Sequence, residues 1–278
     1  MGDVRLYPAL RISLADPAPS RVDALLAILD DFQVTAVNDG EEDVCVYFTR
    51  ADERDAAAAR LRTEPDLTIT IEDVPDDDWA ARSQAGIQPV AAGGFTIAPP
   101  WAVSGASGSV IVIQPSMGFG TGHHASTRLC LRILEQIRVD GRSVLDVGTG
   151  SGVLAIAAAR LGARQVIAVD LDRDALENAR ENLTLNGLLD QVELIEHDLA
   201  AVPLPFNAFD VVLANLTGAL LCRQAAVLGE RVAPGGSLIA SGFQSHEASA
   251  VAAAFTAAGL RLAEQLDESS WVGARFTR

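Results

Sequence analysis

The stretch Ser143–Ala163 constrains the fold more than any other part of this chain. An apolar run, Val144–Val147, has the composition of a buried parallel strand. It leads directly into Gly148–Gly152, where glycine alternates with threonine and serine, and apolar residues at helical spacing follow. Glycine is needed where a chain turns sharply and where a ligand approaches bare backbone. The stretch therefore predicts the strand, turn and helix with which a nucleotide-binding sheet begins.

The spacing of these glycines indicates the kind of ligand. The dinucleotide fingerprint has glycine at its first, third and sixth positions. Here the glycines are Gly148, Gly150 and Gly152, the sixth position is Val153, and Asp146 stands two residues before the first glycine. This arrangement does not suit a pyrophosphate, whereas a carboxylate at position 146 suits a ligand with an amino group, such as the methionine part of S-adenosylmethionine. A strand, turn and helix of an α/β protein without such a ligand is the alternative.

Polar residues follow three further predicted strands of the same sheet. Asp170 comes 22 residues after Gly148, at the end of a strand, where its carboxylate can accept hydrogen bonds from both ribose hydroxyls. Asp198 follows the third strand and either binds the exocyclic amine of adenine or belongs to a turn. Asn215 and Leu216 follow a fourth strand over 210–214, at the carboxyl end where ligands bind in such sheets.

A second glycine-rich stretch, Gln114–Leu134, precedes this sheet. No Gly-Lys-Ser or Gly-Lys-Thr ends it, which argues against a phosphate-binding loop. His123 and His124 are adjacent, so they cannot both face one metal ion from a single side of a helix. We expect no metal site and interpret the stretch as the wall or lid of a pocket.

The first 73 residues predict a separate α+β unit. Strand and helix patterns occur in the order βαββαβ, which is typical of a ferredoxin-like domain. It carries no catalytic constellation, so it serves either stability or dimerisation, or recognition of a macromolecule. Residues 74–114 are predicted to be a linker with a helix and short strands. Residues 115–278 are predicted to be an α/β domain with a Rossmann-like sheet, whose last two strands, 260–267 and 270–276, form an antiparallel edge hairpin.

Composition limits the partners and the compartment. The net charge of −16 argues against direct nucleic-acid binding and favours a basic partner. No run of about 18 apolar residues predicts a membrane span, and the start of the chain lacks the pattern of a secretory signal. The three cysteines form no metal or disulfide pattern, so we expect a cytoplasmic protein. All 21 basic residues are arginine, which reflects either a GC-rich genome or an enzyme that avoids methylating its own lysines.

The chain resembles the ribosomal protein L11 methyltransferases, the PrmA family, over nearly its whole length. The resemblance is carried by three blocks: Phe119-Gly120-Thr121-Gly122-His123-His124 with Thr127, Leu145 to Gly152, and Asp170 with Ala214-Asn215-Leu216. It implies a substrate-recognition domain, a linker and a class I methyltransferase domain. It also implies methylation of lysine side chains and of the N-terminal amine of this large-subunit stalk-base protein.

The resemblance also implies which residues bind S-adenosylmethionine. Thr127, Gly148, Asp170 and Asn215 would contact it. With them we place the remaining expected cofactor residues: Phe119, Gly120, Thr121, Asp146, Gly150, Gly152 and Asp198. We expect Asn215 and the backbone carbonyl of Leu216 to accept hydrogen bonds from the incoming amine, with His123 as a weak candidate for a base.

Three interpretations of the function remain. The first is a protein amine methyltransferase that acts as a monomer on a basic ribosomal protein, or on another protein lysine. The second is a small-molecule methyltransferase of the same fold, and the third is a binding module without catalysis. Val153 in place of the last fingerprint glycine disfavours a nicotinamide dehydrogenase.

Overall fold

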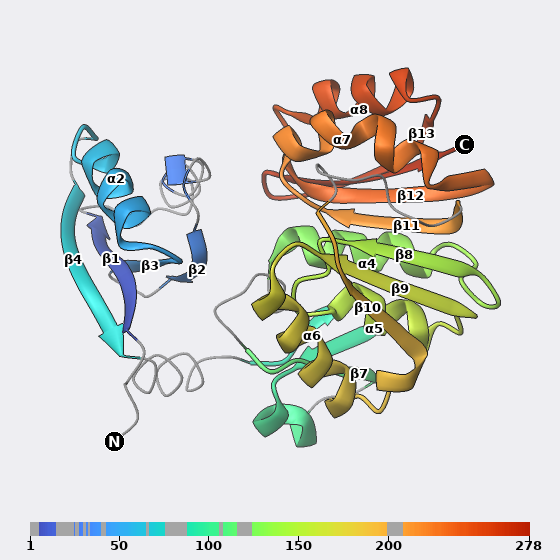
Figure 1. Ribbon diagram of the computed structural model, residues 1–278, viewed down its shortest axis with the longest axis horizontal. Coiled ribbons are helices and arrows are strands. Elements are labelled where there is room, and N and C mark those ends of the chain that lie inside the picture. Colours follow the sequence, from blue (N-terminus) through green and yellow to red (C-terminus); the bar gives the residue numbers. More distant parts are fainter. Residues whose placement is uncertain are drawn as a thin grey trace. The chain divides into compact units, whose positions relative to one another are not determined.

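Figure 1 shows a computed structural model of the chain. It describes residues 6–14, 25, 28–29, 32, 34–39, 43–64, 67–75, 88–105, 108–115, 124–198 and 208–278. Within these ranges two compact units form, one over 6–75 and the other over 88–114 and 124–278. No helix in the described ranges has the length and apolar character needed to cross a membrane.

The first unit is an antiparallel sheet with a helix on one face. Its described elements are β1 (Leu6–Leu14), β2 (Val34–Asp39), β3 (Asp43–Phe48), α2 (Ala51–Leu61) and β4 (Leu67–Pro75). The strand order β2-β3-β1-β4 is that of a ferredoxin-like sheet, as predicted. The helix predicted before β2 lies largely outside the described residues.

Alternation along the strands builds the core of this unit. Leu10 and Ile12 of β1 pack with Val46 of β3 against Ala58 and other apolar residues of α2. Because successive side chains of a strand point to opposite faces, Ala9 joins a separate cluster on the other face. The unit therefore has a core of its own.

The second unit contains the other described elements. They are β5 (Val90–Ala92), β6 (Phe95–Ala98), η1 (Pro100–Gly105), β7 (Ser109–Val112), α4 (Ala125–Glu135), β8 (Ser143–Val147), α5 (Val153–Arg160), β9 (Gln165–Asp170), α6 (Arg173–Leu185), η2 (Leu189–Gln191), β10 (Val192–Glu196), β11 (Phe209–Asn215), α7 (Gly218–Glu230), β12 (Val232–Gln244), α8 (Ala248–Ala257), β13 (Arg261–Glu268) and β14 (Trp271–Thr277).

Seven of these strands form one sheet, in the order β10-β9-β8-β11-β12-β14-β13. The first five strands of that order are parallel, and β14 runs antiparallel to both its neighbours. The Rossmann-like sheet and its antiparallel edge hairpin are therefore as predicted.

Helices cover both faces of this sheet, as Figure 1 shows. Val144 and Val211 face the helices α4 and α5, and form one core with them. Leu145 and Val212 face the opposite way and form a second core with α7 and α8. Burial on both faces explains why these strands are continuous apolar runs in the sequence.

A small three-stranded sheet, β5-β6-β7, belongs to the second unit and packs on its first core. The turn between β5 and β6 is fixed by α4, because both carboxylate oxygens of Glu135 accept the Gly94 N–H at 2.7 Å. Gly93 adopts φ +64°, and a Cβ there would lie 1.9 Å from Glu135 Oε2. This turn therefore requires glycine.

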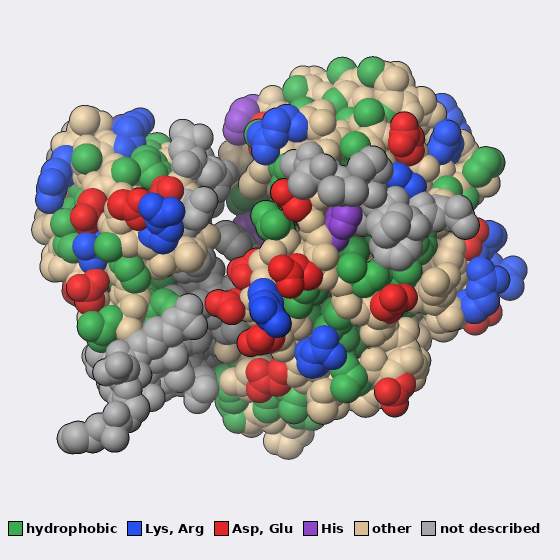
Figure 2. All heavy atoms as spheres, in the orientation of Figure 1, with side chains coloured by type: hydrophobic (Ala, Val, Ile, Leu, Met, Phe, Trp, Pro, Cys, Tyr) green, Lys and Arg blue, Asp and Glu red, His purple; other side chains and the backbone are tan. Residues whose placement is uncertain are grey.

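The surface carries charges of both signs. On the face shown in Figure 2, acidic side chains are interspersed with arginines on each of the two units. The excess of acidic residues behind the net charge of −16 is thus spread over the described surface in this view.

Candidate functional site

The candidate site lies where the strand order changes direction. From β8 the chain adds β9 and β10 on one side, and then β11 and β12 on the other. Because β8 and β11 are parallel, both end at the same edge. A Cβ built on Gly148, after β8, would lie 2.5 Å from Leu216 Cδ2, after β11. The two turns are thus neighbours at the position where open parallel sheets bind ligands.

Backbone hydrogen bonds hold the glycine loop against the neighbouring strand at this edge. Gly148, Gly150 and Gly152 have φ angles of 68°, 54° and 80°, in the left-handed region that favours glycine. The N–H groups of Gly148 and Thr149 donate to Val169 O at 2.9 and 3.0 Å. The loop is therefore hydrogen-bonded to the end of β9, and at its glycines no side chain covers the backbone.

Asp170 lies beside this loop at the end of β9. Its Oδ2 accepts the Gly150 N–H at 2.9 Å, and its Oδ1 accepts the Asp172 N–H at 3.0 Å. Each carboxylate oxygen has two lone pairs, so both retain acceptor capacity for a pair of hydroxyls. The next residue, Leu171, is 66% exposed and adds apolar surface beside the carboxylate.

Asp146 lies beneath the glycine loop. It is 1% exposed, and Thr149 Oγ1 donates to its Oδ2 at 2.7 Å. Burial raises the pKa of its carboxyl to about 7, although hydrogen bonds from Thr149 and the Ala155 backbone lower it. We predicted from the sequence that Asp146 binds the amino group of a ligand, and the hydrogen bonds found here join it to the loop itself.

Two oxygen acceptors converge after β11. Asn215 Nδ2 donates to Thr127 Oγ1 at 3.3 Å, and the Leu216 N–H donates to Ser241 O at 2.9 Å. A Cβ built on Gly242 would lie 2.5 Å from Leu216 O and 3.0 Å from Asn215 Oδ1. Both oxygens therefore lie against the bare backbone of Gly242, in a space too small for a Cβ.

The N-terminus of α4 borders this space. Thr127, which contacts Asn215, is buried in the first turn, and His124 caps the helix by accepting the Ser126 N–H at Nδ1. The His124 ring packs edge-on against Trp271, with 4.3 Å between ring centroids. Trp271 pairs with the last residue of β12, so it lies at the same sheet edge as Asn215.

The structure thus brings together most of the predicted residues that it describes: Thr127, Asp146, Gly148, Gly150, Gly152, Asp170, Asn215 and Leu216. Asp198 lies in the loop that follows β10, next to His197, whose N–H donates to Asp170 O at 2.8 Å. Phe119, Gly120, Thr121 and His123 lie outside the described residues. In the described ranges, no group of three His, Cys, Asp or Glu side chains is arranged to hold a metal ion.

Sequence reasoning overlooked Gly242 and Trp271. Gly242 lies inside a long strand, and its closeness to Leu216 O follows only from the pairing of β11 with β12. Trp271 was predicted only as part of the edge hairpin. One signal was present, because a glycine inside a strand often marks close approach of another backbone.

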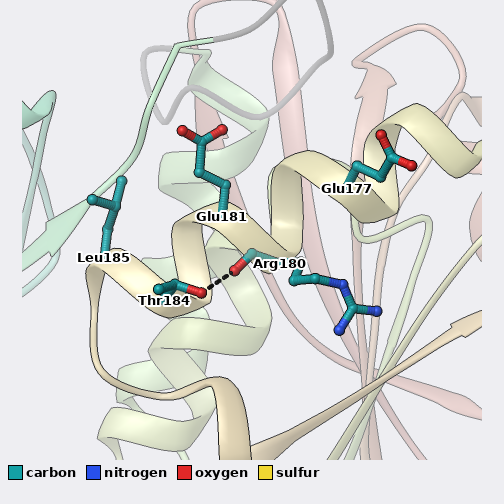
Figure 3. A pocket seen from close by; sticks show the side chains of 5 residues that line it. All are labelled: Glu177, Arg180, Glu181, Thr184 and Leu185. Atoms are coloured by element: carbon teal, nitrogen blue, oxygen red, sulfur yellow. Dashed lines mark hydrogen bonds between the residues drawn. The ribbon is translucent and has the colours of Figure 1, made fainter.

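A separate hollow lies along the outer side of α6. It has a volume of about 380 Å³ and is lined by Glu177, Arg180, Glu181, Thr184 and Leu185. Figure 3 shows these side chains pointing outward from successive turns of the helix. They include none of the predicted site residues, so this hollow is distinct from the glycine loop.

Comparisons with known proteins identify the family of this chain. Residues 17–278 match the family model described as "Ribosomal protein L11 methyltransferase (PrmA)". A ribosomal protein L11 methyltransferase from Pelobacter propionicus is 39% identical over 255 residues, covering 84% of this chain and 81% of the relative. One from Thermus thermophilus is 39% identical over 201 residues, covering 72% and 78%.

A solved structure extends the likeness to three dimensions. The ribosomal protein L11 methylase from Lactobacillus delbrueckii subsp. bulgaricus superposes with a TM-score of 0.62 at 27% identity, covering 69% of this chain and 98% of that one. The family match covers almost the whole chain and includes every predicted site residue. The chain therefore belongs to the ribosomal protein L11 methyltransferase (PrmA) family.

Proposed function

We propose that this protein transfers the methyl group of S-adenosylmethionine to amino groups of ribosomal protein L11. The observation that carries the proposal is the sheet edge where the glycine loop, with Asp170 hydrogen-bonded to it, adjoins the turn of Asn215 and Leu216. Family membership supports both the reaction and the substrate. The proposal includes a monomer that acts in the cytoplasm on a basic protein, and the net charge of −16 supports that choice of partner.

The residues present fit S-adenosylmethionine. Gly148 and Gly150 leave bare backbone at the sheet edge, where a Cβ on Gly148 would fill space against Leu216. Asp170 has acceptor capacity for two ribose hydroxyls, and the exposed Leu171 offers an apolar surface for a flat base. When bound there, the cofactor supplies an electrophilic methyl group on a positively charged sulfur.

Asn215 and Leu216 would hold the amine that receives the methyl group. Asn215 Nδ2 is engaged by Thr127, and this contact turns the amide oxygen toward Gly242. Two acceptors on one side of an amine direct its hydrogens toward them and its lone pair away. Alignment of this kind contributes roughly 7–11 kcal/mol toward a reaction barrier.

The amine must lose a proton before its nitrogen forms the new bond to carbon. A free lysine has a pKa of about 10.4 and is charged near pH 7. An apolar surrounding lowers that pKa, and the Leu216 side chain supplies apolar atoms beside Gly148. Asn215 Oδ1 and Leu216 O accept hydrogen bonds from the amine, and the proton leaves to solvent.

The test is methylation of purified L11 with labelled S-adenosylmethionine. We expect the full chain to label L11, and the variant Asn215→Ala to lose about 100-fold in kcat, because a misplaced reactant costs this much. Its thermal unfolding should stay near that of the wild type, since Asn215 is only half-buried. Equal turnover by wild type and variant would remove Asn215 from the mechanism.

A further inference from the structure

Three asparagines on one face of α6 hold the outer edge of β7 and the residues after it. Asn178, Asn182 and Asn186 follow one another at intervals of four residues, so they share a face. Asn186 exchanges two hydrogen bonds with the backbone of Val112, at 3.0 and 2.6 Å. The Gln114 N–H donates to Asn182 Oδ1 at 2.7 Å, and Gln114 O accepts from Asn178 Nδ2 at 3.5 Å.

These side chains take the place of a neighbouring strand. In an extended chain, alternate residues present their N–H and C=O groups to the same edge. Val112 and Gln114 are two apart, and the amides of α6 satisfy that edge much as a β-strand would. The contacts fix the backbone just before the segment that carries the predicted cofactor residues Phe119–Thr121.

Asn182 differs from the other two because it also reaches the glycine loop. Its Nδ2 donates to Ser151 O at 2.9 Å, and its side chain is 0% exposed. One buried amide therefore joins Ser151, inside the loop between β8 and α5, to Gln114, after β7. Among the described residues, the side-chain hydrogen bonds of Asn178 and Asn186 do not reach the loop, although both residues lie on the same helix face.

We propose that Asn182 is a positioning residue for cofactor binding. It fixes the peptide that follows Ser151, in a loop whose flanking glycines have wide conformational freedom. Through Gln114 it also fixes the loop relative to β7, the strand that precedes the predicted cofactor residues Phe119–Thr121. This inference rests on the proposed function, because the loop is taken to bind S-adenosylmethionine.

The test compares Asn182→Ala with Asn186→Ala in the full-length protein. Both variants remove an amide that binds the backbone near β7, but only the first removes the contact with Ser151 O. Calorimetry gives the Kd for S-adenosylmethionine, and hydrogen–deuterium exchange reports on peptides that cover 148–156 and 110–115. Thermal unfolding shows how much stability each variant loses.

We expect Asn182→Ala to raise the Kd about tenfold, because partners that orient a binding group contribute that much. Exchange over 148–156 should rise in this variant alone. In Asn186→Ala the Kd and the glycine loop should match the wild type, while exchange over 110–115 rises. An equal change of Kd in both variants, or unchanged exchange over 148–156 in Asn182→Ala, would overturn the inference.

A second variant covers the case in which Asn182→Ala does not fold. Asn182→Asp has the same size and keeps the acceptor for the Gln114 N–H, but at pH 8 it loses the donor to Ser151 O. Faster exchange over 148–156 is expected here too, and unchanged exchange would count against the proposal. If the wild type binds no S-adenosylmethionine, the proposed function fails, and the exchange comparison still decides the role of Asn182.

Discussion

At the scale of single residues, the site depends on positions where a side chain is absent as much as on those where one is present. Gly242 has φ +89°, and its missing Cβ lets Leu216 O and Asn215 Oδ1 approach its backbone closely. Asp146, in contrast, fills the space below the loop and carries an ionisable group into the core. Gly242 and Asp146 therefore each lead to a separate prediction.

Gly242→Ala should abolish methyl transfer, because a Cβ there would lie 2.5 Å from Leu216 O and would displace the two proposed acceptors of the amine. Gly187→Ala is the matched control, because Gly187 also has a positive φ, of 68°, but a Cβ there meets nothing within 4 Å. Both variants should lose about 1–2 kcal/mol of unfolding free energy from left-handed backbone strain. We expect kcat to fall about 100-fold for Gly242→Ala alone. A similar kcat for the two variants, measured with L11, would contradict a role of the two acceptors beside Gly242 in methyl transfer.

The Asp146 carboxyl makes stability depend on pH. Its pKa is raised from 3.8 to about 7 in the fold, so between these values the native state holds a proton that the unfolded chain has lost. Stability from this group is complete below about pH 4 and declines as pH rises toward 7. Urea unfolding of wild type and Asp146→Asn should therefore diverge over that window, with the wild type losing a few kcal/mol relative to the variant. Parallel curves from pH 4 to 8 would show that the carboxyl is not protonated in the fold.

At the scale of elements, α4 links the small sheet to the large one. Its C-terminal residue Glu135 binds the turn of β5 and β6 through Gly94, and its first turn carries Thr127 to Asn215. Replacing Glu135 by alanine should cost about 1 kcal/mol, because the Gly94 N–H loses its charged acceptor at an exposed turn. Glu177→Ala on the exposed side of α6 should change the unfolding free energy by less than about 0.5 kcal/mol. Equal urea midpoints for these two variants would contradict the role of Glu135.

The elements that the sequence predicted well are those with strong periodicity. The strands β8 and β11 are apolar on both faces; β8 ends just before Gly148 and β11 ends at Asn215, and both residues were assigned to the site. The small strand β5 was missed because its three residues carry no pattern. Pro234-Gly235-Gly236 has the composition of a turn but lies within β12, near a register shift against β11.

Which residues face one another was harder to predict than which elements form. Whether Asp146 contacts the ligand depends on the face of β8 toward which its side chain points. The local sequence does not determine that face. The convergence of Leu216 O and Asn215 Oδ1 on Gly242 depends on the parallel register of β11 and β12. Contacts of that kind are set by pairing between strands and leave no trace in local composition.

At the scale of the whole molecule, the chain forms two units with separate cores. The first unit buries Leu10, Phe48 and Leu61 in a core of its own, and none of the predicted site residues that the structure describes lies in that core. If it recognises a protein substrate, a chain that begins at Gln88 should still bind S-adenosylmethionine with a Kd within about twofold of the full chain. Its kcat/KM for L11 should fall about 100-fold, which corresponds to about 2.7 kcal/mol of lost transition-state stabilisation. Full activity of the shortened chain on L11 would contradict this role and would assign the first unit to stability or association.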